Sequence, residues 1–125
     1  MLKETDIEGE RTASAAERAK RFLAVSACDS AAEVLSHFEM RHRDDDRPRK
    51  AIEAGRAWLR GEISVGMARD AAFAAHAAAR ASNDPAAIAA ARSAGHAAAT
   101  AHVAGHAHHA AAYAIKAAAA AEKPE

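Results

Sequence analysis

The stretch AHAAARASNDPAAIAAARSAGHAAAT, residues 75–100, carries the clearest indication of the fold. It contains two runs dominated by Ala, the residue with the highest intrinsic helix propensity, separated by Asn83-Asp84-Pro85. Asp84 suits the N-cap of a helix and Pro85 suits its first position, so this tripeptide ends one helix and starts the next. A connection this short predicts two neighbouring antiparallel helices.

The excess of Ala extends over the rest of the chain. Ala accounts for 41 of the 125 residues, whereas the larger apolar residues number only 21. Strands are therefore disfavoured, and helices are expected to approach closely through small side chains. We expect an all-α, compact antiparallel bundle of about four to five helices with Ala-rich packing. The expected core anchors are Phe22, Phe38, Trp58 and Phe73.

Capping residues place the first helices. Ser14-Ala-Ala-Glu17 is a capping-box pattern, and the apolar spacing after it predicts one helix over about 14–42. A break at Asp29-Ser30 is the alternative. The next helix is expected to begin near Pro48, within the charged segment RHRDDDRPRK (41–50), and to stop at Gly61.

The later helices follow from the same signals. Ser64 is the expected N-cap of a helix that runs to about Ser82. The final helical region is expected to run from 85 toward 121, with a break between Gly105 and His109. We therefore expect a single helical domain over 13–121, a flexible N-terminal arm over 1–12 and a frayed tail over 122–125.

Charge and cysteine content exclude several classes of protein. The 17 basic residues balance 17 acidic ones, which disfavours a nucleic-acid-binding protein. No apolar run is long enough for a membrane span, and the charged start is not a signal peptide, so we expect no membrane and a cytoplasmic location. Cys28, the single cysteine, is expected to pack as a small core residue.

Five of the eight histidines lie between His96 and His109. The spacing of His102, His106 and His109 would place three imidazoles on one helical face, which makes them weak candidates for metal ligands. No Cys, Asp or Glu lies within ten residues of the three, and Gly105 interrupts them. Exposed or helix-terminal histidines are the favoured interpretation, and no metal or other cofactor is expected.

A polar pocket between helices is a second hypothesis. Antiparallel pairing about Asn83 would place Asp70 opposite His96 and Gly66 opposite Thr100, so that the carboxylate could orient the ring. A structural histidine at a helix crossing is the favoured alternative. The candidate pocket residues are Asp70, His76, Arg80, His96, Thr100 and His102. Because no nucleophile is evident near them, an enzyme is not expected.

The charged segment offers candidates for contact with another protein. Asp46, Arg47, Arg49 and Arg56 are suited to bidentate guanidinium–carboxylate contacts across an interface. Helix capping and local salt bridges are the favoured alternative for the same residues.

Three segments resemble one known family. DDDRPRKAIEAGRAWLRGEI (44–63), AAHAAARAS (74–82) and AARSAGHAAATAHVAGHA (90–107) are similar to the putative immunity proteins of bacterial polymorphic toxin systems, in the immunity-family-five-like group. The resemblance covers about residues 20–116. The chain departs from the family pattern at Ser26 and at Ser30-Ala31-Ala32, where members tend to have an aromatic residue and a Cys–Ala–Glu run.

The resemblance implies an α-helical, non-catalytic protein that binds and neutralises a cognate toxin, whose identity the sequence does not give. A homodimer is possible as well. The alternative function is a small-molecule or metal-binding helical domain that uses the histidines. The polar positions that match the family pattern are Asp46, Arg47, Arg49, Glu53, Trp58, Glu62, His76, Arg80, His96, Thr100 and His102.

Overall fold

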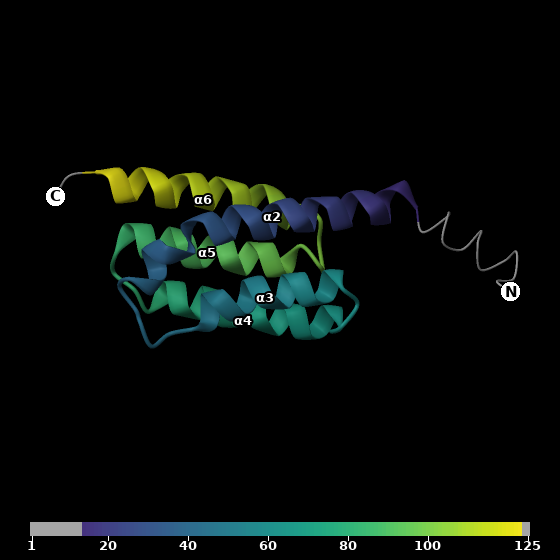
Figure 1. Ribbon diagram of the computed structural model, residues 1–125, viewed down its shortest axis with the longest axis horizontal. Coiled ribbons are helices and arrows are strands. Elements are labelled where there is room, and N and C mark those ends of the chain that lie inside the picture. Colours follow the sequence, from purple (N-terminus) through teal and green to yellow (C-terminus); the bar gives the residue numbers. More distant parts are fainter. Residues whose placement is uncertain (1–13, 124–125) are drawn as a thin grey trace, which may run out of the picture.

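The described part of the chain, residues 14–123 of a computed structural model, is an all-helical bundle (Figure 1). Its helices are α2 (Ala15–Glu39), α3 (Arg47–Leu59), α4 (Val65–Arg80), α5 (Pro85–Ala99) and α6 (His106–Glu122). Residues 14–123 contain no strand. The expected all-α antiparallel bundle is therefore confirmed. The expected N-terminal arm and the last two residues of the expected tail lie outside the described residues.

Helix α5 is the central element of the bundle. It packs against α2, α3, α4 and α6, with α2 and α6 along one side in Figure 1 and α3 and α4 along the other. Eleven of its 15 residues are buried, and all eleven are Ala, Ser or Gly. A helix approached from four directions has room only for small side chains, because each neighbouring axis lies close. The Ala-rich stretch 75–100 therefore lies at the centre of the fold.

The residues that the sequence predicts as helix caps act as caps in the structure. The side chain of Ser64 accepts a hydrogen bond from Met67 N at 3.1 Å, and Asp84 accepts one from Ala87 N at 2.9 Å. Gly61 has φ +74°, and Glu62 N donates to Ala57 O at 2.9 Å, which is a Schellman ending for α3.

Two helix boundaries differ from expectation. Helix α2 is continuous through Asp29 and Ser30, so the alternative of a break there is wrong, and the helix ends at Glu39 rather than near residue 42. The break before α6 covers 100–105 rather than Gly105 to His109. Thr100 is the C-cap of α5 and its hydroxyl donates to His96 O at 3.0 Å.

Two of the four expected aromatic anchors are correct. Phe38 is fully buried and Trp58 is 9% exposed, whereas Phe22 is 75% and Phe73 is 63% exposed. The core-facing stripe of α4 consists of Ala68, Ala72, Ala75, Ala78 and Ala79. The neighbouring helices approach this stripe too closely for a large side chain, so Phe73 lies outside it. Phe22 likewise lies outside the buried face of α2.

Cys28 is buried in the core as expected, and its pKa is raised to about 11 by that burial. Its environment depends on Gly55 of α3, since a Cβ at position 55 would lie 2.8 Å from Cys28 Sγ. The glycine therefore allows α3 to lie directly on α2 and α5.

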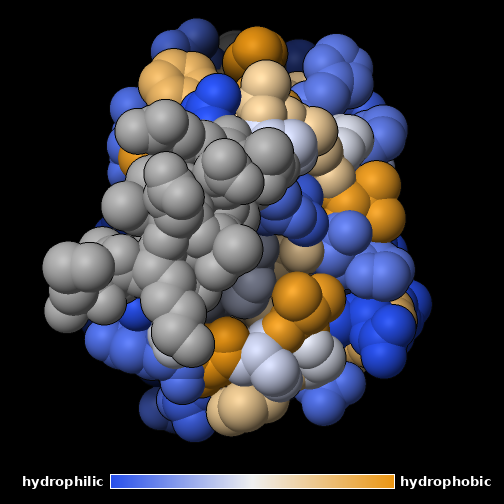
Figure 2. All heavy atoms as spheres, turned by 90° about the vertical axis from the view of Figure 1, so that its right-hand side faces the viewer, coloured by the Kyte–Doolittle hydropathy of each residue, from blue (hydrophilic) through white to orange (hydrophobic). Residues whose placement is uncertain are grey.

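The surface of the bundle is mixed. Figure 2 shows the end at which α2 begins, and apolar side chains outside the grey atoms are separated there by polar ones. Exposed apolar residues near this end include Val65, Met67 and Val103. None of the described helices is long and apolar enough to cross a membrane.

Candidate functional site

The most distinctive polar arrangement is a group of aromatic rings from three helices, which we call the histidine cluster. It consists of His76, His96, His106, His109 and Tyr113. Helices α4 and α6 each pack on α5 but make no extensive contact with each other. The cluster lies between α4 and α6, along the side of α5 that neither of them covers.

His96 of α5 is the centre of the cluster. Its Nδ1 atom lies 2.9 Å from His106 Nδ1, which is a hydrogen bond between two imidazoles. Its ring lies parallel to the ring of Tyr113, with centroids 5.4 Å apart and an angle of 7° between the planes. The rings of His109 and His76 lie 5.0 and 4.8 Å from it. His96 therefore joins α4, α5 and α6 through ring contacts.

His76 of α4 reaches α5 because Gly95 has no side chain. A Cβ at position 95 would lie 2.7 Å from His76 Nε2, so the imidazole packs directly against the backbone of α5. Arg92 donates from Nη1 to His76 Nδ1 at 2.9 Å. A guanidinium is only a donor, so this contact leaves the proton of a neutral His76 on Nε2.

The surroundings lower the pKa of His76, His96 and His106, which keeps these three rings neutral near pH 7. Burial, followed by the neighbouring Arg92 and Arg80, lowers the pKa of His76 to about 4. Burial and the neighbouring imidazoles lower the pKa of His96 to about 4, and burial lowers that of His106 as well. Neutral imidazoles can accept hydrogen bonds and exchange protons. A neighbouring anion would favour their protonated form, because its charge offsets the cost of burying an imidazolium.

The weak metal candidates do not form a site. The described residues contain no group of three or more His, Cys, Asp or Glu side chains that could hold a metal ion. The helical face expected for His102, His106 and His109 does not exist, because His102 lies in the break at 100–105 and is exposed. His106 and His109 instead contact His96.

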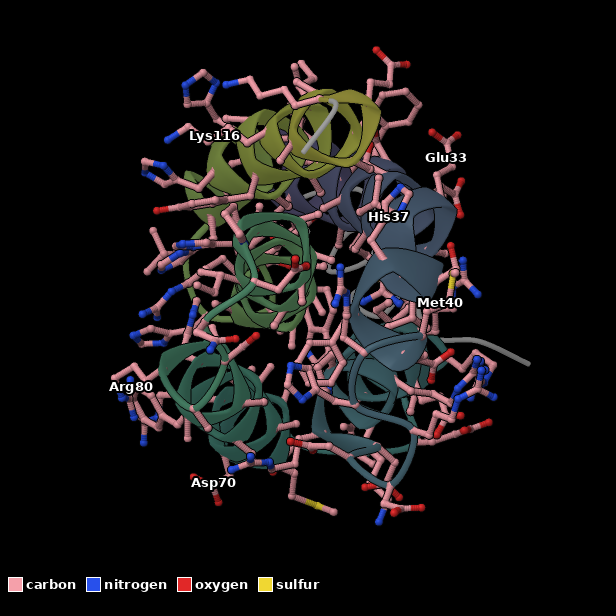
Figure 3. The ribbon with its side chains drawn as sticks, turned by 90° about the vertical axis from the view of Figure 1, so that its left-hand side faces the viewer. Glu33, His37, Met40, Asp70, Arg80 and Lys116 are labelled. Carbon is pink, nitrogen blue, oxygen red and sulfur yellow. The ribbon has the colours of Figure 1, made fainter. Side chains whose placement is uncertain are left out.

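The expected pairing of Asp70 with His96 is wrong. Asp70 is exposed, and Figure 3 places it and Arg80 on different sides of α4. The α4 residue beside His96 is His76, six positions after Asp70 and about 9 Å farther along the helix. Pairing about Asn83 gives the wrong register, because the close contact at Gly95 sets how the two helices meet.

The remaining pocket candidates are dispersed. Thr100 is fully buried and its hydroxyl is bonded within α5. Gly66, expected opposite Thr100, is exposed near Ser64. Arg80 is exposed at the end of α4. Of the predicted pocket residues, the structure brings His76 and His96 into contact and places Arg80 near His76.

Sequence reasoning missed two members of the site. Arg92 lies one turn before His96 on α5, and Tyr113 follows His106 and His109 at helical spacing on α6. That spacing was a usable signal, because positions i, i+3 and i+7 share a helical face.

The charged residues proposed for partner contact are paired within the chain. Arg47 binds Asp45 through two hydrogen bonds of 2.9 and 2.7 Å, and Arg49 binds Glu39 through two of 2.7 and 2.6 Å. The other pairs are Arg56 with Asp29 at 3.1 Å and Lys50 with Asp46 at 3.3 Å. These exposed pairs connect α3 to α2 and to the turn before α3.

Comparison with known proteins gives one result. A family model described as Imm-5 like putative immunity protein matches residues 13–125. No curated protein and no solved structure matches the chain significantly. The match spans the five helices of residues 14–123 and therefore includes the histidine cluster.

Proposed function

We propose, from the premise that this chain belongs to the Imm-5 like putative immunity protein family, that it binds a cognate bacterial toxin and neutralises it. The family match over residues 13–125 is the observation that carries this proposal. The toxin is expected to be the product of a polymorphic toxin system, and the complex is expected to form in the cytoplasm of the protected cell.

The buried nucleophilic side chains have structural roles, which is in keeping with a binding protein. Ser93 is buried and donates to Ala110 O at 2.7 Å, so its hydroxyl joins α5 to α6. Thr100 is bonded to the backbone of its own helix, and burial holds the thiol of Cys28 in its protonated form. Each of the three groups is occupied by packing or by a backbone carbonyl.

Steric occlusion is the mechanism that suits a small helical bundle. A tight inhibitory complex buries on the order of 1,600 Å² and depends on a few anchoring residues. Asp46, Arg47, Arg49 and Arg56 stay candidates for such contacts, because their side chains are partly exposed and their ion pairs hold them in defined positions.

Growth rescue tests this function. Each toxin domain encoded beside the gene for this chain is expressed from an inducible promoter in a bacterial host, with this chain or with an unrelated helical protein of similar size. We expect one toxin to arrest growth with the control protein and not with this chain, and the pair to elute as a complex. If the chain accumulates in folded form and rescues growth from none of these toxins, the proposal is wrong.

The native mass of the purified chain is measured in the same experiment. It determines whether the chain alone is a monomer or the homodimer proposed from the sequence. The mass of the complex then gives the number of toxin chains bound by each copy.

A further inference from the structure

We infer that the face formed by α4, α5 and α6 around the histidine cluster binds an acidic segment of a protein partner. We call it the cationic face, and we define it by the histidine cluster together with Arg80, Arg92 and Lys116. The inference rests on the proposed function in one respect, since the partner is taken to be the toxin. Figure 3 shows Arg80 and Lys116 on the same side of the bundle, from α4 and α6.

Within residues 14–123, the cations of this face have no carboxylate partner. Arginines of α3 are paired with acidic residues, as Arg47, Arg49 and Arg56 are. On the cationic face, Arg92 contacts an imidazole and Lys116 lies 5.1 Å from the centroid of the Tyr113 ring. Helix α5 has no acidic residue, and the only one in α6 is Glu122 at its last position. The cations of this face are therefore available to carboxylates supplied by a partner.

Interface-type side chains and an apolar hollow lie beside these cations. Tyr113 and Arg92 belong to the residue types that most often anchor protein interfaces. Next to Tyr113 lies a hollow of about 360 Å³, and its lining is almost entirely apolar. The hollow is lined by Pro85, Ile88, Ala89, Tyr113, Lys116 and Ala120. The face therefore offers an apolar slot beside unpaired cations, a combination that fits a peptide segment with an apolar residue next to carboxylates.

Nucleic acid is the less favoured occupant. The face has three permanent cations, whereas proteins that bind duplex DNA tightly often neutralise about 6–10 phosphates. The chain as a whole has no net charge, so its overall field does not attract a polyanion. An acidic protein segment needs fewer cations and uses the apolar slot as well.

The histidines give the complex a pH dependence. The titratable and charged groups on this face are His76 and Arg80 from α4, Arg92 and His96 from α5, and His106, His109, Tyr113 and Lys116 from α6, with His102 nearby in the turn. None of them is acidic at neutral pH. A partner carboxylate would favour the imidazolium form, so binding takes up protons and is expected to strengthen as the pH falls from 7.5 to 6.

The test uses a synthetic peptide of eight glutamates with one central Leu, titrated into the full isotopically labelled chain at low salt. We expect shifts of the imidazole resonances of His76 and His96, and stronger binding at pH 6 than at pH 7.5. The Arg80→Ala/Lys116→Ala variant should bind about tenfold more weakly. Both side chains are exposed, so this variant keeps the fold, and its circular dichroism spectrum checks that.

The matched control is Arg43→Ala/Lys50→Ala, which removes the same charge from the turn before α3 and from the first turn of α3 and should bind within about twofold of the unmodified chain. Equal weakening in both variants, or shifts confined to other residues, would overturn the inference. Tighter binding of an eight-nucleotide thymidine oligomer than of the peptide would instead assign the face to nucleic acid. If growth rescue fails while the peptide binds here, the proposed function falls and the inference stands.

Discussion

The Nδ1 atoms of His96 and His106 lie 2.9 Å apart, so a single proton joins α5 to α6 at this point. One imidazole donates through Nδ1 and the other accepts through the same atom. If both rings were protonated, two N–H groups would face each other at this distance. The contact therefore allows at most one positive charge on the pair, which agrees with the lowered pKa of both rings.

Stability should fall in mild acid because of this cluster. His76 and His96 have a pKa of about 4 in the folded chain and 6.5 in the unfolded chain, so the unfolded chain binds more protons between these values. The stabilisation is full above pH 6.5 and is lost as the pH falls toward 4. After allowance for solvent screening of these half-buried rings, we expect a loss of about 1–2 kcal/mol at pH 5. Urea unfolding followed at 222 nm between pH 7.5 and 4.5 measures it.

Carboxylates also titrate near pH 4.5, so this measurement needs a comparison. The His96→Asn/His106→Asn variant keeps a hydrogen-bonding group at both positions and does not titrate. It should be less stable at pH 7.5 and lose less stability on acidification. Parallel pH curves for the two proteins would show that the cluster is not the cause.

Gly95→Ala should separate α4 from α5 at the histidine cluster. The new Cβ would lie 2.7 Å from His76 Nε2 and would push the ring away from Arg92 and His96. Such overpacking costs about 1–3 kcal/mol, against which Ala gains about 1 kcal/mol of helix propensity. A net destabilisation of up to about 2 kcal/mol is expected from thermal unfolding.

Gly66→Ala is the matched control for this substitution. Gly66 is also helical, but the nearest atom to a Cβ there is Ser64 Oγ at 3.8 Å. The substitution should be neutral or stabilising. If Gly95→Ala stabilises the chain as much as Gly66→Ala does, then His76 does not pack on α5 as described.

Phe38 and Phe22 should respond oppositely to truncation. Phe38 is fully buried, so Phe38→Ala should cost about 3–5 kcal/mol through lost burial and the cavity left behind. Phe22 is 75% exposed, and Phe22→Ala should change stability by about 0.5 kcal/mol or less. Chemical denaturation of both variants measures the difference. Similar losses for the two would mean that Phe22 is buried in solution, as in a homodimer.

The sequence predicted the fold because its signals are local. Asp84, Ser64 and Gly61 act within a few residues of themselves, and each does in the structure what its residue type favours. The periodicity of the larger apolar residues was a poorer guide. When Ala is the packing residue, close approach matters more than hydrophobicity, so Phe22 and Phe73 lie outside while Ala fills the core.

The site could be predicted only in part, because it depends on register. His76 and His96 were recognised as candidates, yet the partner assigned to His96 was Asp70. A register error of six residues moves the contact by about 9 Å. What fixes the register is the fit of an imidazole against Gly95, a contact between residues far apart in the sequence.

Gly55 and Cys28 provide a test of the closest helix contact in the core. Gly55→Ala would place a Cβ 2.8 Å from Cys28 Sγ, with the backbone of α5 at 3.6 Å on another side. Cys28 is fully buried, so the sulfur has no free space to move into, and we expect a loss of about 1–3 kcal/mol. Cys28→Ala in the same chain removes the sulfur, so the double variant should recover most of the stability lost on adding the methyl group. A double-mutant cycle by urea unfolding gives this coupling directly. Additive losses would mean that α3 is held away from α2 and α5, and that Gly55 is not the residue that lets it lie against them.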